Sequence, residues 1–467
     1  MDERQGLRRR TLVWAGGGAV AGGLAGMVPS MSWQFWQERE DLKGEPLKIL
    51  SGRDDTADGQ RRLLVKKWND KNKDHQAELV ELPGVADLQY NAIHAALQSG
   101  DTGVDAVVLD LPWIAEFAAA GRLRALGEVE SEDLLPAPLE AGRYDGDLYA
   151  LPFNTDVGML YYRKGEVTDP ATGTVGPEDV RSLRDWDGLR ECIGKILGAS
   201  GDFKGGIAMQ LASYEGFIVN VWEYLLANGV RPGEGGRIRF GEDSDAGDAL
   251  GRLVGDLYED AGGGATVVLT EALQHTEDDS LLAFQSGLTP FLRHWPRAHE
   301  FLRSCEAGLD FEVGAVPMPG AVLGGQSLAV NAASKRPKAS KALIEFLTDS
   351  DSQQELFDGG FGATREGPYR DAFTRADGTE PEEPAACVNG IQRPRPDAEE
   401  LYAALTGKRP DDTHDPDQPP PGTRPAVQRY TQYSRAFREY LHPRLRPKGD
   451  PDPKALQRAL DRAIAGK

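Results

Sequence analysis

Charged and aromatic side chains follow three predicted strands of this 467-residue chain, at the ends where those strands stop. They are Arg53 and Asp54 after Leu47–Ser51, Asp110 and Trp113 after Asp105–Leu109, and Trp295 and Arg297 after Leu288–Leu292. Ligands of open parallel sheets bind outside the carboxyl ends of the strands. We therefore take these side chains as candidates for a ligand site.

The types of these side chains indicate a neutral ligand that is rich in hydroxyl groups. Carboxylates and arginines form charge-assisted hydrogen bonds with neighbouring hydroxyls, and a tryptophan face covers the C–H face of a sugar ring. Gly325 and Gln326 stand just before the predicted strand Ser327–Asn331. They add a backbone position that a ligand can approach closely and a side-chain amide.

Each candidate also has a purely structural interpretation. Asp110 is suited to cap the helix that begins near Pro112. Trp113 and Trp295 are equally suited to a hydrophobic core, and Arg297 to a solvated helix face. Their coincidence at strand ends favours a ligand site over any of these alternatives.

The segment Leu151–Gly165 has the pattern of a crossing between two packed units. Pro152 marks a turn, the polar run Asn154–Asp156 follows, and Val157–Tyr162 is an apolar run of strand length. The polar entrance of such a strand would lie where a cleft opens between the units. An ordinary edge strand after a turn is the alternative.

Strand and helix patterns alternate before this crossing. The expected strands are 47–51, 77–82 and 105–109, and the expected helices are 59–72, 86–99 and 112–120. This alternation predicts a parallel sheet with helices on its faces, the first half of a doubly wound lobe.

Helical patterns dominate after the crossing and predict a second, more helical lobe. We expect helices at 185–197, 214–228, 245–260 and 278–286, strands at 206–209 and 237–240, and a loop at 169–176. Strands are then expected at 288–292, 312–316 and 327–331, and helices at 296–303, 337–348, 352–357, 427–441 and 454–465. The Pro- and Asp-rich stretch 408–425 indicates a loop or disorder.

Length and charge limit the classes of protein. A chain of this length is too long for one core, so two or three domains are expected. The formal net charge of −21 argues against a nucleic-acid-binding protein, which needs clustered lysines and arginines to neutralise phosphates. A solvated acidic surface explains this charge without any ligand.

The N-terminal segment has the pattern of an export signal. Arg8–Arg10 precede the apolar, Gly-rich run Leu12–Val28, and the adjacent arginines resemble a twin-arginine signal. Trp33, Phe35 and Trp36 follow, as in the aromatic belt of a membrane anchor. A cleaved signal, an uncleaved anchor and a buried soluble helix therefore remain as alternatives, and the first two place the bulk of the chain outside the cytoplasm.

Signatures of enzymes and metal sites are mostly absent from the sequence. The chain has no GxGxxG, P-loop or HExxH motif, and Cys192, Cys305 and Cys387 have no zinc spacing. The segment Gly325–Ala329 is close to G-x-S-x-G, but its serine opens a strand instead of following one. The acidic clusters at 54–58 and 243–245 suit helix capping better than calcium binding. We expect no catalytic residue, no cofactor and no metal.

Several segments resemble the extracellular solute-binding proteins of carbohydrate ABC transporters. They are LPFNTDVGMLYYRKG, LLAFQSGLTPFLRHWPRA, EVGAVPMPG and GGQSLAVNAASKRPKASKALIEFLTDSDSQQELF, in the order of the family. WNDKNKDHQAELVELPGVADLQ and VDAVVLDLPWIAEFAAAGRL are similar to its trehalose/maltose-binding branch in particular. The resemblance extends from about Leu47 to about Arg365.

The resemblance implies an α/β, periplasmic-binding-protein-like fold, in which two α/β lobes are joined by a hinge with a ligand cleft between them. It places in the cleft Asp110, Trp113, Asn154, Asp156, Trp295, Arg297, Gly325 and Gln326, and we add Arg53, Asp54 and Arg365. Arg365 lies in a segment that matches the family except that Ala363 replaces the usual proline. The expected boundaries are 1–44 for the signal or anchor, 45–153 and 288–345 for the first lobe, and 154–287 and 346–467 for the second lobe with the hinge return.

We therefore expect an extracytoplasmic protein that binds a disaccharide or oligosaccharide and delivers it to an ABC transporter permease. Its expected partners are the sugar and the permease, with a membrane contact through the N-terminal segment, no nucleic acid, and a monomeric state. A membrane-anchored sugar sensor or scaffold with the same fold is the first alternative. A glycosidase with paired carboxylates is the second.

Overall fold

The computed structural model describes residues 45–467, except 55, 57–58, 168–180, 200, 232–244, 304–307, 377–386, 389–390, 393–396, 410, 412 and 415–417. The N-terminal segment 1–44, the predicted loop 169–176, the predicted strand 237–240 and Cys305 lie outside these described residues. Every helix in the described part of the chain is too short or too polar to span a lipid bilayer.

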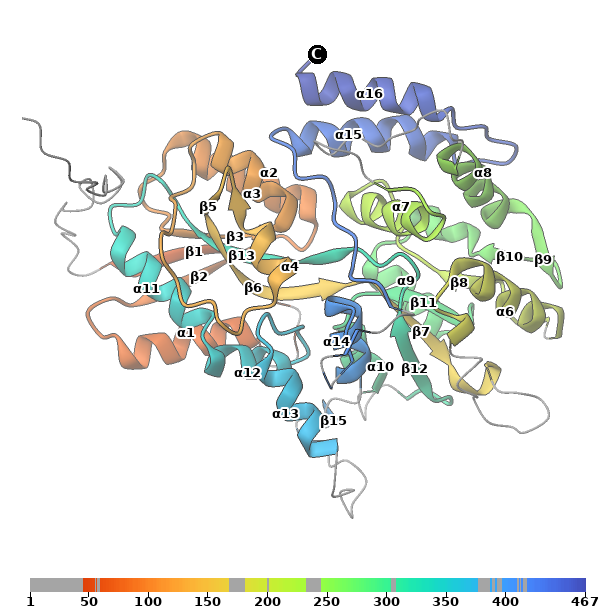
Figure 1. Cartoon of the computed structure of the whole chain (residues 1–467), viewed down its shortest axis with the longest axis horizontal. Helices are drawn as coiled ribbons and strands as arrows, with labels where there is room; N and C mark the ends of the chain where they lie inside the picture. Colours follow the sequence, from red (N-terminus) through yellow and green to blue (C-terminus); the bar gives the residue numbers. More distant parts are fainter. Residues whose placement is uncertain are drawn as a thin grey trace, which may run out of the picture. The chain divides into compact units, whose positions relative to one another are not determined.

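The first sheet has the strand order β2–β1–β3–β13–β6 (Figure 1). Its strands are β1 (Leu47–Gly52), β2 (Ala77–Leu82), β3 (Ala106–Asp110), β6 (Ala150–Val157) and β13 (Leu323–Val330). β1 pairs in parallel with β2 and β3, as the alternating pattern predicts. β13 runs antiparallel to β3 and β6, because it returns from the second lobe and enters at the edge where β3 ends. The sheet is therefore mixed, and the prediction of a parallel sheet holds only for its first three strands.

Helices cover both faces of the first sheet. They are α1 (Gln60–Lys71), α2 (Ala86–Ser99), α3 (Leu111–Ala119), α4 (Pro136–Ala141), α11 (Pro337–Leu347) and α12 (Ser350–Asp358). Helix α13 (Gly367–Ala376) follows them and packs against α12. Successive side chains of a strand point to opposite faces. Accordingly, Ala106 and Val108 of β3 join a hydrophobic cluster with α1 and α11, while Val107 and Leu109 join a cluster with α2 and α3.

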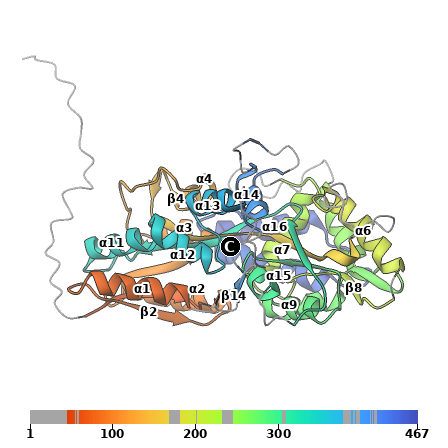
Figure 2. The same cartoon turned by 90° about the horizontal axis from the view of Figure 1, so that it is seen from below.

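The second sheet has the order β12–β7–β11–β8–β10–β9, and its helices lie beside those of the first lobe in Figure 2. Its strands are β7 (Met159–Arg163), β8 (Gly205–Ala208), β9 (Asp260–Gly262), β10 (Ala265–Val268), β11 (Phe291–His294) and β12 (Val313–Pro317). The later helices are α6 (Trp186–Ala199), α7 (Glu215–Ala227), α8 (Asp245–Tyr258), α9 (Glu277–Gln285), α10 (Ala298–Arg303), α14 (Ala398–Thr406), α15 (Tyr430–Leu441) and α16 (Pro453–Ala465). Short two-stranded pairs join β4 (Arg143–Tyr144) to β5 (Asp147–Leu148) and β14 (Cys387–Val388) to β15 (Ile391–Gln392).

The chain passes from the first sheet to the second at Gly158, between β6 and β7. A Cβ atom at Gly158 would collide with the carboxylate of Glu223. Arg293 holds this carboxylate with two hydrogen bonds, of 2.7 Å and 2.6 Å. The return crossing, between β12 and β13, reaches the same carboxylate through the Val322 amide at 3.4 Å. One buried ion pair therefore contacts these two crossings.

Three of the expected lobe boundaries are wrong. Residues 154–157 belong to β6 of the first sheet, so the crossing lies four residues later than expected. The strand predicted at 288–292 is β11, which pairs with β7 in the second sheet. Helix α12 packs against α1 in the first lobe. Hydrophobic periodicity predicts that a strand or helix exists but does not determine its partner.

A methyl group at the first crossing is expected to destabilise the fold. The substitution Gly158→Ala should lower the free energy of unfolding by about 1–3 kcal/mol, because the Glu223 carboxylate that it meets is fixed by Arg293. Urea unfolding followed by circular dichroism measures this change. Gly165→Ala, where the added carbon meets no atom within 4 Å, is the matched control and should leave the midpoint nearly unchanged. An equal midpoint for both variants would contradict the prediction.

Candidate functional site

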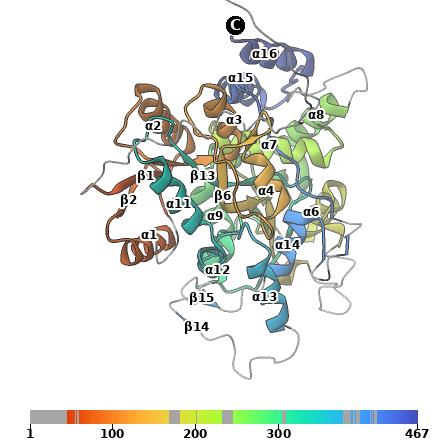
Figure 3. The same ribbon diagram turned by 60° about the vertical axis from the view of Figure 1, so that its left-hand side comes forward.

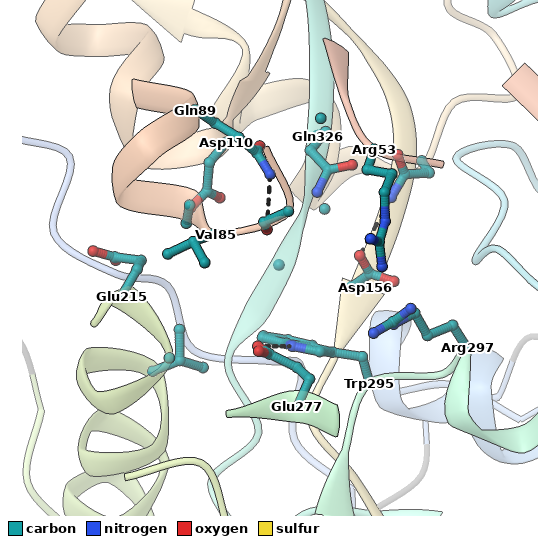
Figure 4. Close-up of a pocket in the computed structure, with 18 of the residues that line it drawn as sticks. Arg53, Val85, Gln89, Asp110, Asp156, Glu215, Glu277, Trp295, Arg297 and Gln326 are labelled. Atoms are coloured by element: carbon teal, nitrogen blue, oxygen red, sulfur yellow. Dashed lines mark hydrogen bonds between the residues drawn. The ribbon is translucent and has the colours of Figure 1, made fainter. Parts of the chain in front are cut away.

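A cavity of about 450 Å³ lies between residues of the two sheets and their helices (Figure 4). The first lobe contributes Gly52, Arg53, Arg61, Asp110, Trp113, Asn154, Asp156, Gly324, Gly325 and Gln326. The second lobe contributes Tyr214, Glu215, Glu277, Asp278, Trp295, Arg297 and Glu300. The volume of the cavity is that of small-molecule sites in proteins, and polar groups converge on the cavity.

The structure brings most of the predicted site residues together at this cavity. These are Arg53, Asp110, Trp113, Asn154, Asp156, Trp295, Arg297, Gly325 and Gln326. Asp54 and Arg365 are not among the lining residues. The common rim that we expected at the strand ends is therefore present, with two exceptions.

Strand register explains why three of these residues are neighbours. Gln326 of β13 stands opposite Asp110 of β3 on one side and opposite Asn154 of β6 on the other. The three side chains therefore form a row across the edge of the first sheet that faces the cavity. Gly325, with φ of 106°, brings the β13 backbone against the Asn154 carbonyl, where a Cβ atom would collide.

Arg61 orients the two amides of this row. Its guanidinium donates to Asn154 Oδ1 at 2.9 Å and to Gln326 Oε1, and also to Ser51 Oγ at 3.0 Å. An arginine has only donors, so it must face the oxygen of each amide. The Asn154 nitrogen is turned toward Asp156, to which it donates at 3.3 Å. The sequence analysis did not find Arg61, because this residue lies in a predicted helix where an arginine is expected on the solvent-exposed face.

Asp110 caps a helix, as its structural interpretation predicts, and it also lies at the cavity wall. Its Oδ1 accepts from the Leu111 amide at 2.8 Å and so caps α3, and the side chain also lines the cavity. Both carboxylate oxygens accept from Arg424, at 2.5 Å and 2.7 Å. Arg424 also donates to Glu215 at 2.9 Å, and burial raises the pKa of the Glu215 carboxyl against the opposing effect of Arg424.

The two tryptophans differ in their surroundings. Trp113 is 4% exposed and packs edge-on against Tyr90, so it belongs mainly to the core and only borders the cavity. Trp295 is half-buried, and its Nε1 donates to Glu277 Oε1 at 3.3 Å. Gly324 makes room for the Trp295 ring, which would lie 2.9 Å from a Cβ atom at that position. The Gly-rich signal before β13 therefore has a packing explanation as well.

The buried Arg293 guanidinium packs against the ring of Trp295. The Arg293 guanidinium lies 4.0 Å from the ring centroid of Trp295, and Glu223 and Gln210 hold it on its other side. Burial, together with the nearby Arg297 and Arg293, lowers the pKa of His294 to about 3. His294 is therefore neutral at physiological pH and adds no further positive charge beneath the ring.

Two predicted site residues have local structural roles instead. Asp54 is buried and accepts from the Thr56 hydroxyl at 2.7 Å and the Arg61 amide at 2.7 Å, at the start of α1. Arg365 donates to the Thr348 carbonyl at 2.8 Å and to Asp133. Arginines and carboxylates also form hydrogen bonds with the backbone at the ends of loops and helices. Their spacing in the sequence does not distinguish this structural role from ligand binding.

Arg424 and Glu215 are lining residues that the sequence analysis missed. Arg424 lies in the stretch 408–425 that we expected to be loop or disorder, and its sequence neighbours give no signal of a site. Glu215 begins α7, where an acidic residue is expected on helix grounds alone. Among the described residues, no group of three or more acidic, histidine or cysteine side chains could hold a metal ion.

Comparison with known proteins identifies relatives. The model of the bacterial extracellular solute-binding protein family matches residues 64–379. A probable ABC transporter-binding protein of Deinococcus radiodurans is 24% identical over 302 residues, which are 61% of this chain and 67% of that protein. A maltotriose-binding protein of Pyrococcus abyssi is 31% identical over 128 residues, which are 27% of this chain and 25% of that protein.

Solved structures share the fold. The maltose-bound MalE3 of T. maritima has a TM-score of 0.69 at 25% identity, and the match covers 90% of this chain and 98% of that one. The GacH receptor of Streptomyces glaucescens has a TM-score of 0.66 at 18% identity, over 91% of this chain and all of that one. Because the family match covers more than half of the chain, the chain belongs to the bacterial extracellular solute-binding proteins and acts outside the cytoplasm.

Proposed function

We propose that the cleft binds a carbohydrate, a disaccharide or short oligosaccharide, which the protein delivers to the permease of an ABC transporter. The observation that carries this proposal is the Trp295 ring at the wall of a cavity whose other walls offer carboxylates, arginines and amides. Arg293 covers one face of the indole, and the ring borders the cavity, where it can contact a ligand. A sugar matches this arrangement, because it presents a C–H face to the ring and hydroxyls to the polar groups around it.

The relatives support a sugar in particular. One is a maltotriose-binding protein, and one solved structure of the same fold holds maltose. No bond is broken in this proposal, and closure of the two lobes around the ligand is the signal that the permease receives. Asp110 and Glu215 both accept hydrogen bonds from Arg424, which holds the two carboxylates in fixed positions as a binding site requires.

The N-terminal segment and the oligomeric state belong to the same proposal. We propose that the twin-arginine pattern at 8–10 directs export and that the exported chain acts as a monomer. A membrane-anchored sensor with the same sugar site is the alternative, motivated by the aromatic residues after the apolar run. Release of a shortened, soluble form from cells would favour the transport protein, and retention in the membrane fraction would favour the sensor.

Sugars that bind the cleft should stabilise the folded chain. A thermal-shift panel of maltose, maltotriose and trehalose, with a free amino acid as the negative control, measures this effect. At 100 times its dissociation constant a ligand adds about 2.7 kcal/mol to the free energy of unfolding, so the melting temperature should rise by several degrees. A flat response to every sugar would contradict the proposed function.

Loss of the Trp295 ring should weaken sugar binding. The substitution Trp295→Ala removes the stacking face and is expected to raise the dissociation constant about 5- to 30-fold, which corresponds to about 1–2 kcal/mol. Isothermal titration with the sugar that gives the largest thermal shift measures the change. Trp295→Phe keeps an aromatic face and serves as the matched control, with an effect of less than half that size in free energy. Equal affinities of Trp295→Ala and the unmodified chain would exclude this role.

A further inference from the structure

The stretch that follows α14 runs between the lobes and lies beyond the residues 64–379 that match the family. In Figure 1 it is the dark blue chain that descends from α15 toward α14 between the two sheets. It pairs with the return crossing: the Leu323 amide donates to the Gly422 carbonyl at 2.8 Å, and the Gly422 amide donates to the Ala321 carbonyl at 2.8 Å. Two residues later, Arg424 reaches the cavity.

Arg424 connects the two walls of the cavity. Its guanidinium takes both oxygens of Asp110, at the end of β3 in the first lobe. The same guanidinium takes Oε1 of Glu215, at the start of α7 in the second lobe, at 2.9 Å. Only 4% of the Arg424 side chain is exposed, so these bonds are largely shielded from water. A planar fork of donors suits this double contact, which a lysine ammonium does not reproduce.

We propose that Arg424 is a positioning residue of the ligand site, which sets the separation of the two cleft walls by bridging Asp110 and Glu215. In this role it fixes the Asp110 carboxylate in the orientation that a ligand meets. It also makes the lobes associate at this end of the cleft before any ligand arrives, which reduces the ordering that binding requires.

Helix α15 adds a second set of bridges. The Thr431 hydroxyl donates to Glu116 of α3 at 2.8 Å, in the first lobe, while the Ser434 hydroxyl donates to Glu215 of α7 at 2.8 Å, in the second. Arg438 donates to Asp87 of the first lobe at 2.6 Å and to the Ser213 carbonyl at 3.4 Å.

We call residues 418–438 the interlobe strap. Figure 3 shows α15 above both α3 and α7, and the helix packs against each of them. Arg424 is therefore held in the cavity by a segment that is itself attached to both lobes. The strap extends the link between the lobes from the hinge to one end of the cleft.

Small-angle X-ray scattering of the full chain without ligand tests this inference. In Arg424→Gln the lobes should open, and the radius of gyration should exceed that of the unmodified chain. Asp110→Asn should have the same effect, because asparagine keeps the cap of α3 but loses the ion pair. Arg435→Gln is the matched control: it removes the same charge from an exposed position on α15, and its scattering should equal that of the unmodified chain.

The double variant Asp110→Asn/Arg424→Gln separates a bridge from two unrelated effects. If both residues act through one contact, the double variant should open no further than Arg424→Gln alone. Additive opening would overturn the inference. The inference would also be overturned if the Arg424→Gln variant folds, as judged by a circular dichroism spectrum equal to that of the unmodified chain, and its scattering is unchanged. If Arg424→Gln does not fold, Asp110→Asn decides the question by the same measurement.

The identity of the ligand in this inference rests on the proposed function. The scattering test does not depend on that identity. Scattering is measured without sugar, so a panel in which no sugar raises the melting temperature would remove the sugar assignment and leave the scattering result intact. Unchanged scattering in both single variants would remove the role of Arg424 and leave sugar binding to be judged by the thermal shifts.

Discussion

The ion pair of Arg293 with Glu223 is the contact on which the site and the hinge both depend. Both side chains are wholly buried, so the pair is stable only because its geometry is bidentate and its remaining groups are satisfied. Glu223 lies against Gly158 at one crossing and accepts from Val322 at the other. Arg293 lies beneath Trp295. The tryptophan that we propose as the stacking residue and two points where the lobes join are thus connected through one buried ion pair.

Charge in the cleft is organised by arginines that each hold several acceptors. Arg61 takes the oxygens of Asn154 and Gln326, and Arg424 takes those of Asp110 and Glu215. Polar groups held in this way are presented to a ligand already oriented, and they lose little freedom when it binds. The arrangement suits a neutral polar solute, which needs many directed hydrogen bonds and carries no charge to be compensated.

The sequence predicted β1, β2, β3 and the second half of β13 in the first sheet, and most of the cavity wall, because residues at the ends of adjacent strands must lie near one another. It missed β6: Pro152, which we expected to mark a turn, lies within that strand and stands opposite Ser327 of β13. The sequence could not predict that β11 belongs to the second sheet, because apolar periodicity does not determine which strand pairs with which. Asp54 and Arg365 lie outside the cavity lining and bond to helix and loop ends, which carboxylates and guanidinium groups satisfy as readily as they bind ligands. The sequence analysis missed Arg61 and Arg424 because both are buried by hydrogen bonds to residues that are distant in the sequence. A local sequence pattern does not predict such contacts.

The position of β13 has a consequence for how the chain reaches its native state. Ser327 pairs with Leu109 only after the entire second sheet has been made, because β13 fills the gap between β3 and β6. Until then the apolar edges of both strands are uncovered. Such distant pairing raises the contact order, and proteins of high contact order fold more slowly than proteins with mainly local contacts. The first sheet can therefore be completed only after the strands of the second sheet have been synthesised, because β13 follows all of them in the sequence.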